Sequence, residues 1–232
     1  MKTNFDNVAQ VIDALNTAGV LYLILRNYEN LLDDNIYVGG HEDIDFLCAD
    51  YAEIVEILGA ISNRKKADGT HYHIFVNGNR VNLDLRSVGD GYYCEKWQKE
   101  MLLNRRLYKT FYVMSERDYY YSLIHHAILQ KKVFTEEYHD RLKKMAENLG
   151  IFLCNHDSES FINNLQDYML QNDYVFEYTI DPSIPLQYHL VNKSLIKSDK
   201  KRLRTRRVFL VKTNAKKLIV GLMYKVYKKM FR

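Results

Sequence analysis

Two aspartates separated by one residue, Asp43 and Asp45, are the residues of this 232-residue chain whose spacing most clearly predicts chemistry. They alternate with Ile44 and Phe46 in a short run that predicts a β-strand, and side chains at i and i+2 of a strand leave the same face. Two carboxylates held so close repel each other unless a cation lies between them. Mg²⁺ commonly takes one or two carboxylates together with water and substrate phosphates. The pair therefore predicts part of a magnesium site, with Mn²⁺ as an alternative ion.

A third carboxylate, Asp84, lies between Leu83 and Leu85 in a later segment that also predicts a strand. We interpret 71–86 as a hairpin with its turn at 77–79, because Asn-Gly marks tight turns between strands. If the sheet places Asp84 beside the first pair, the three acids either hold two metal ions, or hold one ion while Asp84 accepts a proton from an attacking hydroxyl. Transfer of a phosphorus-centred group needs little beyond such positioning and charge neutralisation.

Three further residues are candidates for binding the phosphates of a substrate. Arg26 and Asn27 directly follow an apolar run at 20–25, and a guanidinium binds phosphate through paired hydrogen bonds. Arg86 lies on the same predicted strand face as Asp84, where it either binds a phosphate or neutralises that aspartate. The predicted catalytic and metal-binding residues are Asp43, Asp45 and Asp84, and the predicted substrate-binding residues are Arg26, Asn27 and Arg86.

The hydrophobic pattern predicts a sheet with helices packed on it, which is what these side chains need for support. The expected elements, in order, are a helix over 5–18, a buried strand over 20–25, a loop, the strand with Asp43 and Asp45, a helix over 52–61 and the hairpin over 71–86. Beyond the loop at 87–93 the pattern is helical to about residue 170, most clearly at 119–131 and 136–149. The expected fold class is α/β (α+β), a mixed sheet flanked by helices with a mostly helical C-terminal extension.

Charge divides the chain into two unequal parts. Residues 191–232 contain fifteen Lys or Arg and one acid and carry +14, whereas residues 1–190 carry −10. Parts of such different charge are expected to meet different partners. The expected organisation is a catalytic core over 1–115, a helical extension over 116–190 and a basic tail over 191–232.

The end of this tail predicts an amphipathic helix. Its apolar stripe consists of Ile219, Leu222, Met223, Val226, Tyr227, Met230 and Phe231. Such a stripe beside basic residues is typical of a helix lying on an anionic membrane, where each Lys or Arg contributes about 1 kcal/mol. The alternatives are a helix docked on its own domain, or a basic arm that binds RNA. Since no apolar run reaches the ~18 residues of a membrane span and the N-terminus lacks a signal-peptide pattern, the predicted location is cytoplasmic, peripheral on the inner face of the cell membrane.

Histidine and cysteine do not predict a zinc site. His71 and His73 alternate on a predicted strand, but no further Cys or His stands at the spacing of a zinc finger. His125 and His126 lie in a tyrosine-rich helix, where a buried histidine is more frequent than a catalytic one.

The order of the elements resembles the nucleotidyltransferase superfamily over about residues 5–130. The segments LILRNYENL, DIDFL and NLDLRSVGDGYY are similar to a branch found among bacterial enzymes of surface polysaccharide and capsule assembly, distantly similar to the LicD-type phosphotransferases. The resemblance implies that Asp43 and Asp45 are the metal ligands and Asp84 the third acid. The superfamily usually has Gly-Ser where this chain has Arg26-Asn27, so different side chains are expected to contact the donor phosphates here.

Three functions are consistent with the sequence. The first is a Mg²⁺-dependent transferase that moves a nucleotidyl or phospho-alcohol group from a nucleotide or CDP-alcohol donor to a glycan or lipid-linked saccharide. The second is a nucleic-acid-directed nucleotidyltransferase, for which the basic tail would bind the nucleic acid. The third is a non-catalytic regulatory module of the same fold, which the presence of all three acids disfavours.

Overall fold

The structure, a computed structural model, describes residues 4–37, 43–65 and 68–230, with side chains in the last helix given as far as residue 216 and at Val220. Its described strands form one mixed sheet in the order β1-β5-β6-β3-β2-β8-β7, and β4 pairs with β5. The strands are β1 (Asn4–Phe5), β2 (Tyr22–Ile24), β3 (Asp43–Cys48), β4 (Ile61–Ser62), β5 (His71–Val76), β6 (Asn79–Ser87), β7 (Arg106–Tyr108) and β8 (Phe111–Val113).

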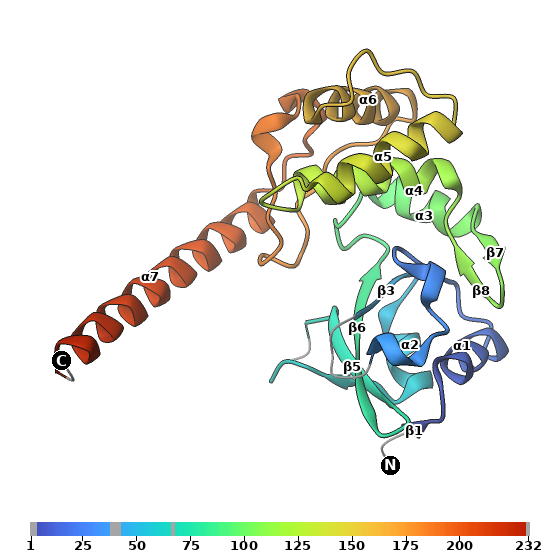
Figure 1. Cartoon of the computed structure of the whole chain (residues 1–232), viewed down its shortest axis with the longest axis horizontal. Coiled ribbons are helices and arrows are strands. Elements are labelled where there is room, and N and C mark those ends of the chain that lie inside the picture. Colours follow the sequence, from blue (N-terminus) through green and yellow to red (C-terminus); the bar gives the residue numbers. More distant parts are fainter. Residues whose placement is uncertain (1–3, 38–42, 66–67, 231–232) are drawn as a thin grey trace.

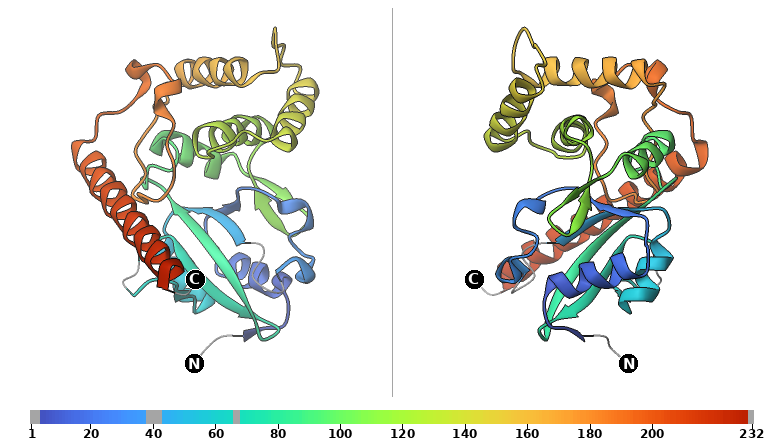
Figure 2. Two further views of the ribbon diagram at one scale, coloured as in Figure 1. Left: turned by 60° about the vertical axis from the view of Figure 1, so that its left-hand side comes forward. Right: turned by 90° about the vertical axis from the view of Figure 1, so that its right-hand side faces the viewer.

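Helices accompany the sheet, which confirms the predicted α/β class. The helices are α1 (Val8–Thr17), α2 (Tyr51–Leu58), α3 (Glu95–Leu103), α4 (Glu116–Ile124), α5 (Glu136–Asn148), α6 (Ser158–Gln171) and α7 (Lys200–Met230). Shorter turns are η1 (Tyr28–Asn30), η2 (Asp34–Tyr37), the π-helical η3 (His125–Leu129), η4 (Tyr188–Leu190) and η5 (Lys193–Leu195). Figures 1 and 2 show α3 to α6 as a layer at one end of the sheet, and α7 leaving the body alone.

The elements of the first half fold as their local patterns predict, except at two helix ends, where Phe5 belongs to β1 and Ile61 to β4. Helix α1 begins at the N-cap Asn7, whose side chain accepts a hydrogen bond from the backbone N–H of Gln10, and its apolar stripe is buried. Asp50 caps α2 in the same way, through the N–H of Ala52. The β5–β6 turn has positive φ at Asn77 and Gly78, as the Asn-Gly pattern predicts.

An aromatic cluster fills the helical layer. The rings of Tyr121 and Tyr168 stack with centroids 3.8 Å apart, and Trp97 stacks on Tyr174 at 5.6 Å. Asp118 Oδ1 accepts hydrogen bonds from Trp97 Nε1 at 2.8 Å and from Tyr168 Oη at 3.0 Å. The tyrosines of this region therefore serve mainly as core, and the hydroxyls of Tyr168 and Tyr174 donate to the carboxylates of Asp118 and Glu100.

The region after residue 93 differs from the sequence prediction, and the first part of the basic tail forms a helix for which the sequence pattern makes no prediction. The segment after residue 93 is not helical throughout, because β7 and β8 form a hairpin that turns at Lys109 and adds to the sheet beside β2. Three-residue strands are too short to show a period, and the β2–β8 pairing is not local. The basic region over 197–212, which shows no clear period, lies mainly in the single long helix α7. Lys and Arg favour helix without an apolar face.

Helix α7 is attached to the body at its first turns. Arg202 donates hydrogen bonds to the carbonyl oxygens of Gly89, at 2.7 Å, and Tyr178, at 2.9 Å. Asp199 Oδ1 accepts from the backbone N–H of Arg202 at 2.9 Å. Farther along, Val208 and Val211 are exposed. The side chains of the predicted apolar stripe beyond residue 216 lie outside the described residues, so that prediction stays open.

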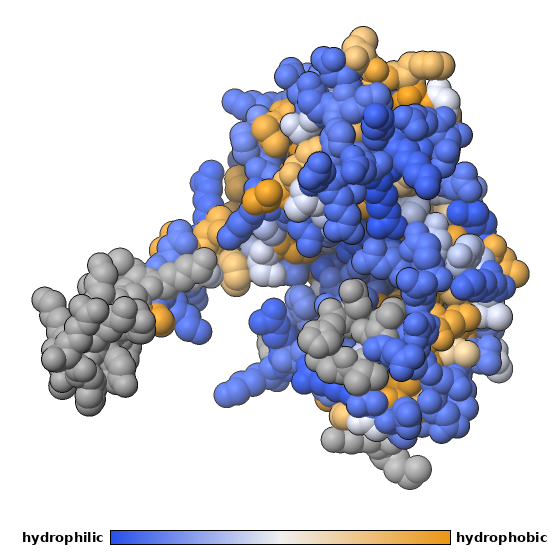
Figure 3. Space-filling view, in the orientation of Figure 1, coloured by the Kyte–Doolittle hydropathy of each residue, from blue (hydrophilic) through white to orange (hydrophobic). Residues whose placement is uncertain are grey.

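The described helices were compared with the length and apolarity that a membrane span needs. Among the helices that the structure describes, none combines the length and the apolarity needed to cross a bilayer. The face seen in Figure 3 is mostly hydrophilic, with separate apolar groups over the helical layer and near the start of α7.

Candidate active site

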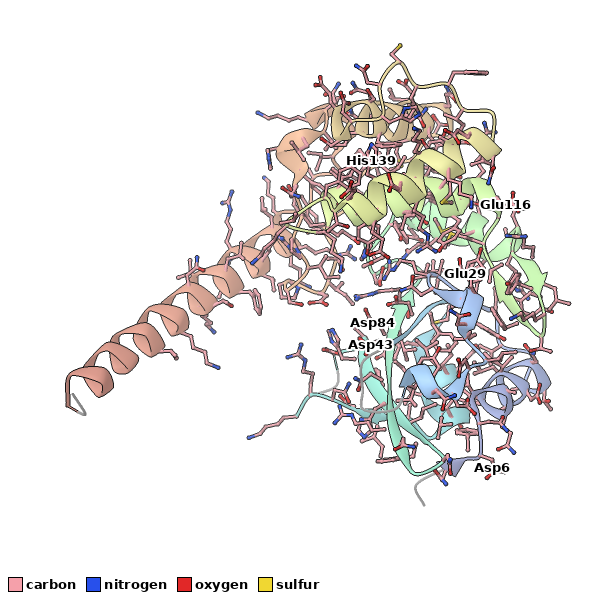
Figure 4. All side chains as sticks on the ribbon, viewed as in Figure 1. Asp6, Glu29, Asp43, Asp84, Glu116 and His139 are labelled. Carbon is pink, nitrogen blue, oxygen red and sulfur yellow. The ribbon has the colours of Figure 1, made fainter. Side chains whose placement is uncertain are left out.

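The sheet brings the three predicted carboxylates together. Strands β3 and β6 run parallel in a register that places Asp45 opposite Asp84 and Asp43 opposite Asn82. The residues that alternate with them, Ile44 and Leu83, are buried in the core. Figure 4 shows Asp43 and Asp84 next to each other on the sheet, below the helical layer in that view. The geometric part of the sequence prediction is therefore confirmed, whereas the chemical roles of these acids stay predictions.

All six residues predicted from the sequence line one cavity of about 410 Å³ between the sheet and the helical layer. This volume is in the range of small-molecule sites. The other residues that line the cavity come from three places in the chain. They are His71 and Tyr92 near the sheet, His126, Gln130, Lys131 and Tyr138 from the helical layer, and Asp181, Ser183, Ile184 and Pro185 from a later segment.

Arg26 is buried and held by two partners in the cavity. Its Nη2 lies 3.0 Å from Asp45 Oδ2, and its Nη1 donates a hydrogen bond of 2.9 Å to Tyr92 Oη. Burial alone would lower the pKa of Arg26, but Asp45 and Tyr92 raise that pKa well above its ordinary value. The guanidinium is therefore charged at any accessible pH, and it holds Asp45 in an ion pair.

Arg86 makes the corresponding pair with the third acid. Its Nη2 lies 2.6 Å from Asp84 Oδ2, and its guanidinium lies over the Tyr92 ring at 4.4 Å from the centroid. The sequence left open whether Arg86 binds phosphate or neutralises Asp84, and this geometry favours neutralisation. The pKa of Asp84 is still raised, because burial and the neighbouring Asp45 outweigh the effect of Arg86.

Asn27 lies at the rim of the cavity in a left-handed conformation, with φ of 53°. Its Oδ1 accepts a hydrogen bond of 3.3 Å from Arg141 Nη1 on α5. Asn tolerates this conformation better than most residues with a side chain. Asn27 thus joins the first strand of the site to the helical layer.

The donor set has room for a cation, although no three described His, Cys, Asp or Glu side chains already converge as a metal site. Asp84 Oδ1 is buried and has no hydrogen-bond partner among the described residues. Such a carboxylate oxygen is costly unless it gains a partner. Four carboxylates line the cavity against Arg26, Arg86 and Lys131, so a negative charge remains. The oxygen-only ligands that Mg²⁺ prefers are present, and these residues fit that ion.

The cavity includes acidic and histidine groups that the sequence reasoning did not select. His71 stands opposite Asp84 across the β5–β6 pair, and its Nδ1 is 2.7 Å from Asp68 Oδ2. Asp181 Oδ2 lies 3.6 Å from His71 Nε2 and 3.7 Å from Arg86 Nη1. His71 could have been found from the sequence, because it pairs with Asp84 in the predicted hairpin. Asp181 lies in the irregular segment 181–185, where no periodic pattern marks it.

The two adjacent histidines are both buried, in agreement with the buried-histidine interpretation. Burial, followed by the nearby charge of Arg26, lowers the pKa of His125 to about 3 and that of His126 to about 2. His126 nevertheless lines the cavity, with its Nδ1 3.4 Å from Tyr92 Oη and 3.3 Å from Gln130 Oε1. As a neutral ring it can orient these two groups.

Comparison with known proteins does not assign the chain to a family. No family model matches it, and no curated protein matches it at a significant level. The resemblance to nucleotidyltransferases therefore rests on the sequence segments quoted for it.

Proposed function

We propose that this protein is a Mg²⁺-dependent transferase of the nucleotidyltransferase type, which moves a nucleotidyl or phospho-alcohol group from a nucleotide-linked donor to a hydroxyl. The observation that supports this most is the β3–β6 register, which sets Asp45 directly opposite Asp84 with Asp43 on the same face of β3. The cavity that these acids share also contains two buried arginines. Carboxylates and guanidinium groups in one cavity suit phosphates that arrive with a divalent ion.

In this proposal each side chain has a distinct role. Asp43 and Asp45 hold the ion, which when bound neutralises donor phosphates and polarises a phosphorus–oxygen bond. Asp84 Oδ2 is held by Arg86, so Oδ1 is the atom left either to complete the ion's ligands or to accept the proton of the attacking hydroxyl. Arg26 and Arg86 hold Asp45 and Asp84 in ion pairs and fix their direction, which prepares the site before the substrate arrives.

The membrane is the proposed location of the acceptor, a glycan or lipid-linked saccharide. Helix α7 extends away from the body, and no other element packs along it in Figure 1. Its described part combines exposed Val208 and Val211 with many basic residues. A basic helix with apolar groups suits an anionic bilayer. An RNA-directed activity is the second candidate, and it would use the same positive charge without the apolar groups.

The test of the function is ion binding followed by donor binding. Mn²⁺ binding by electron paramagnetic resonance should be measurable for the intact chain and lost in Asp43→Asn. Asp167→Asn, an exposed acid on α6, is the control and should bind Mn²⁺ normally. A thermal-shift screen of nucleotides and CDP-alcohols, with and without Mg²⁺, then identifies the donor. If Mn²⁺ binds equally to Asp43→Asn and to the intact chain, the metal-site proposal is wrong, and a non-catalytic module becomes the better interpretation.

A further inference from the structure

The cavity wall opposite the aspartates is built on an unusual turn. The π-helical turn η3 continues directly from α4 and is followed by Gln130 and Lys131, both of which line the cavity. π-helical turns are rare and occur frequently at functional sites. Here the turn brings His126 and Gln130 to the same cavity from one stretch of chain.

Gln130 has a donor with no partner. Its side chain is buried, and its Oε1 is 3.3 Å from His126 Nδ1. Its Nε2 has no hydrogen-bond partner among the described residues. Burying an amide N–H without a partner costs about 1–3 kcal/mol. Retaining such a group at the edge of a polar cavity indicates that a ligand supplies the missing acceptor.

Lys131 adds an unpaired positive charge beside that donor. Arg26 and Arg86 are each engaged with a carboxylate, whereas no carboxylate oxygen of the described residues lies within 4 Å of the Lys131 ammonium. The backbone of this stretch is fixed by Gln187, whose Nε2 donates to the carbonyl oxygens of Lys131 and Ile128 at 2.6 and 2.7 Å. A fixed backbone reduces the entropy lost when a ligand binds.

We propose that Gln130 and Lys131 form an anion subsite for the diphosphate group of the donor. This inference rests on the proposed function and adds a second wall to the site. The Lys131 ammonium and Gln130 Nε2 are both N–H donors, Gln130 Oε1 being next to His126 Nδ1, and phosphate oxygens are acceptors. In a nucleoside triphosphate the subsite binds the diphosphate beyond the reacting phosphorus, and in a CDP-alcohol it binds the diphosphate that includes the reacting phosphorus, while the aspartates across the cavity hold the ion. A nucleoside triphosphate and a CDP-alcohol both contain such a diphosphate.

Calorimetric titration of the full chain with inorganic pyrophosphate, and separately with CDP-glycerol, tests the subsite in the presence of Mg²⁺. Lys131→Ala should weaken binding about tenfold, which corresponds to about 1.4 kcal/mol. Lys132→Ala is the matched control, since Lys132 is exposed and does not line the cavity, and its affinity should change less than about twofold. Gln130→Glu places a carboxylate at the same position and should weaken binding more than Gln130→Leu, because charge repulsion adds to the lost donor.

The outcomes separate the subsite from the proposed function. A loss with either ligand supports the subsite. A loss with pyrophosphate alone favours a triphosphate donor, a loss confined to CDP-glycerol favours a CDP-alcohol donor, and a loss with both supports the subsite for either donor. Mn²⁺ binding should be unchanged in Lys131→Ala. If the intact chain binds Mn²⁺ and pyrophosphate but Lys131→Ala behaves like Lys132→Ala, the subsite is refuted and the proposed function stands. If the intact chain binds neither, both fail.

Discussion

Asp43 and Asp45 allow a sharp test of how the arginines support the site, because the same change to Asn is expected to have different effects on stability. Both acids lie on one face of β3, and both variants should lose activity if they hold the ion. Asp43 is exposed and forms no ion pair with any described residue, whereas Asp45 lies 3.0 Å from the buried Arg26. Sequence pattern alone indicates only repulsion among the acids, which would make both changes harmless to the fold.

The expected loss of stability in Asp45→Asn follows from the ion-pair partner that Arg26 loses. Removing one partner of a buried ion pair costs about 3–5 kcal/mol. The loss should be smaller here, since the Asp45 side chain is 17% exposed, an Asn still accepts one hydrogen bond, and Tyr92 Oη remains a partner of Arg26. We therefore expect Asp45→Asn to lower the free energy of unfolding by about 2 kcal/mol, within the range for a hydrogen bond to a charged group. In a chain of this size that lowers Tm by about 4–8 °C.

Thermal unfolding followed by circular dichroism, with EDTA to remove metal, measures this difference. Asp43→Asn should change Tm by less than about 2 °C, as is usual for an exposed site. The double variant Arg26→Gln with Asp45→Asn should lose less stability than the two single changes added together, because the second change removes a charge already without its partner. Equal Tm values for Asp43→Asn and Asp45→Asn, or strict additivity in the double variant, would refute the reasoning.

Three other expectations follow from the same structure. Burial and Asp45 raise the pKa of Asp84 above 3.8 in spite of Arg86, so the folded state binds this proton more tightly than the unfolded state does. The contribution of Asp84 to stability therefore falls as pH rises from about 4. The Tm of Asp84→Asn relative to the unchanged chain should increase with pH, and a constant difference would contradict this. A chain ending after Arg207 should fold normally but no longer sediment with anionic liposomes. A chain ending after Ser194 should have a lower Tm, because it lacks the buried Leu195 and the Arg202 side chain that attaches α7 to the body. RNA binding without liposome binding by the intact chain would favour the nucleic-acid alternative. Cys154 is exposed and the other two thiols are buried, so a thiol reagent should label one cysteine rapidly in the folded chain and all three in denaturant, and rapid labelling of a second thiol would count against the core described here.

The sheet side of the site could be predicted from sequence because its determinants are local. The D-x-D alternation fixes which residues of β3 share a face, and Asn-Gly fixes the β5–β6 turn. Once those two elements are set, parallel pairing of β3 with β6 brings Asp45 and Asp84 together. The partners of the arginines were harder to predict from sequence, because an Arg near an acid is equally compatible with binding phosphate and with neutralising the acid.

The helical side of the site could not be predicted in the same way. Gln130 and Asp181 are separated by about fifty residues from each other and by more from β3, and they meet only through tertiary packing. Asp181 stands in a segment without periodicity, and Gln130 is distinguished only by a missing hydrogen bond, which no sequence pattern records. The hairpin β7–β8 was missed for a related reason, since its short strands are stabilised by pairing with β2.

The attachment of α7 has a consequence for any variation near the cavity. Arg202 links the start of the helix to Gly89 and to Tyr178, and Tyr178 precedes by a few residues the segment that ends at Pro185 in the cavity wall. A Cβ on Gly91 would collide with both Arg202 and the Tyr178 carbonyl, and its φ of 74° disfavours any other residue. Gly91→Ala would thus disturb the contact between Arg202 and the Tyr178 carbonyl at the start of α7. The start of α7 and the segment that leads into one wall of the cavity are therefore anchored by the same few contacts.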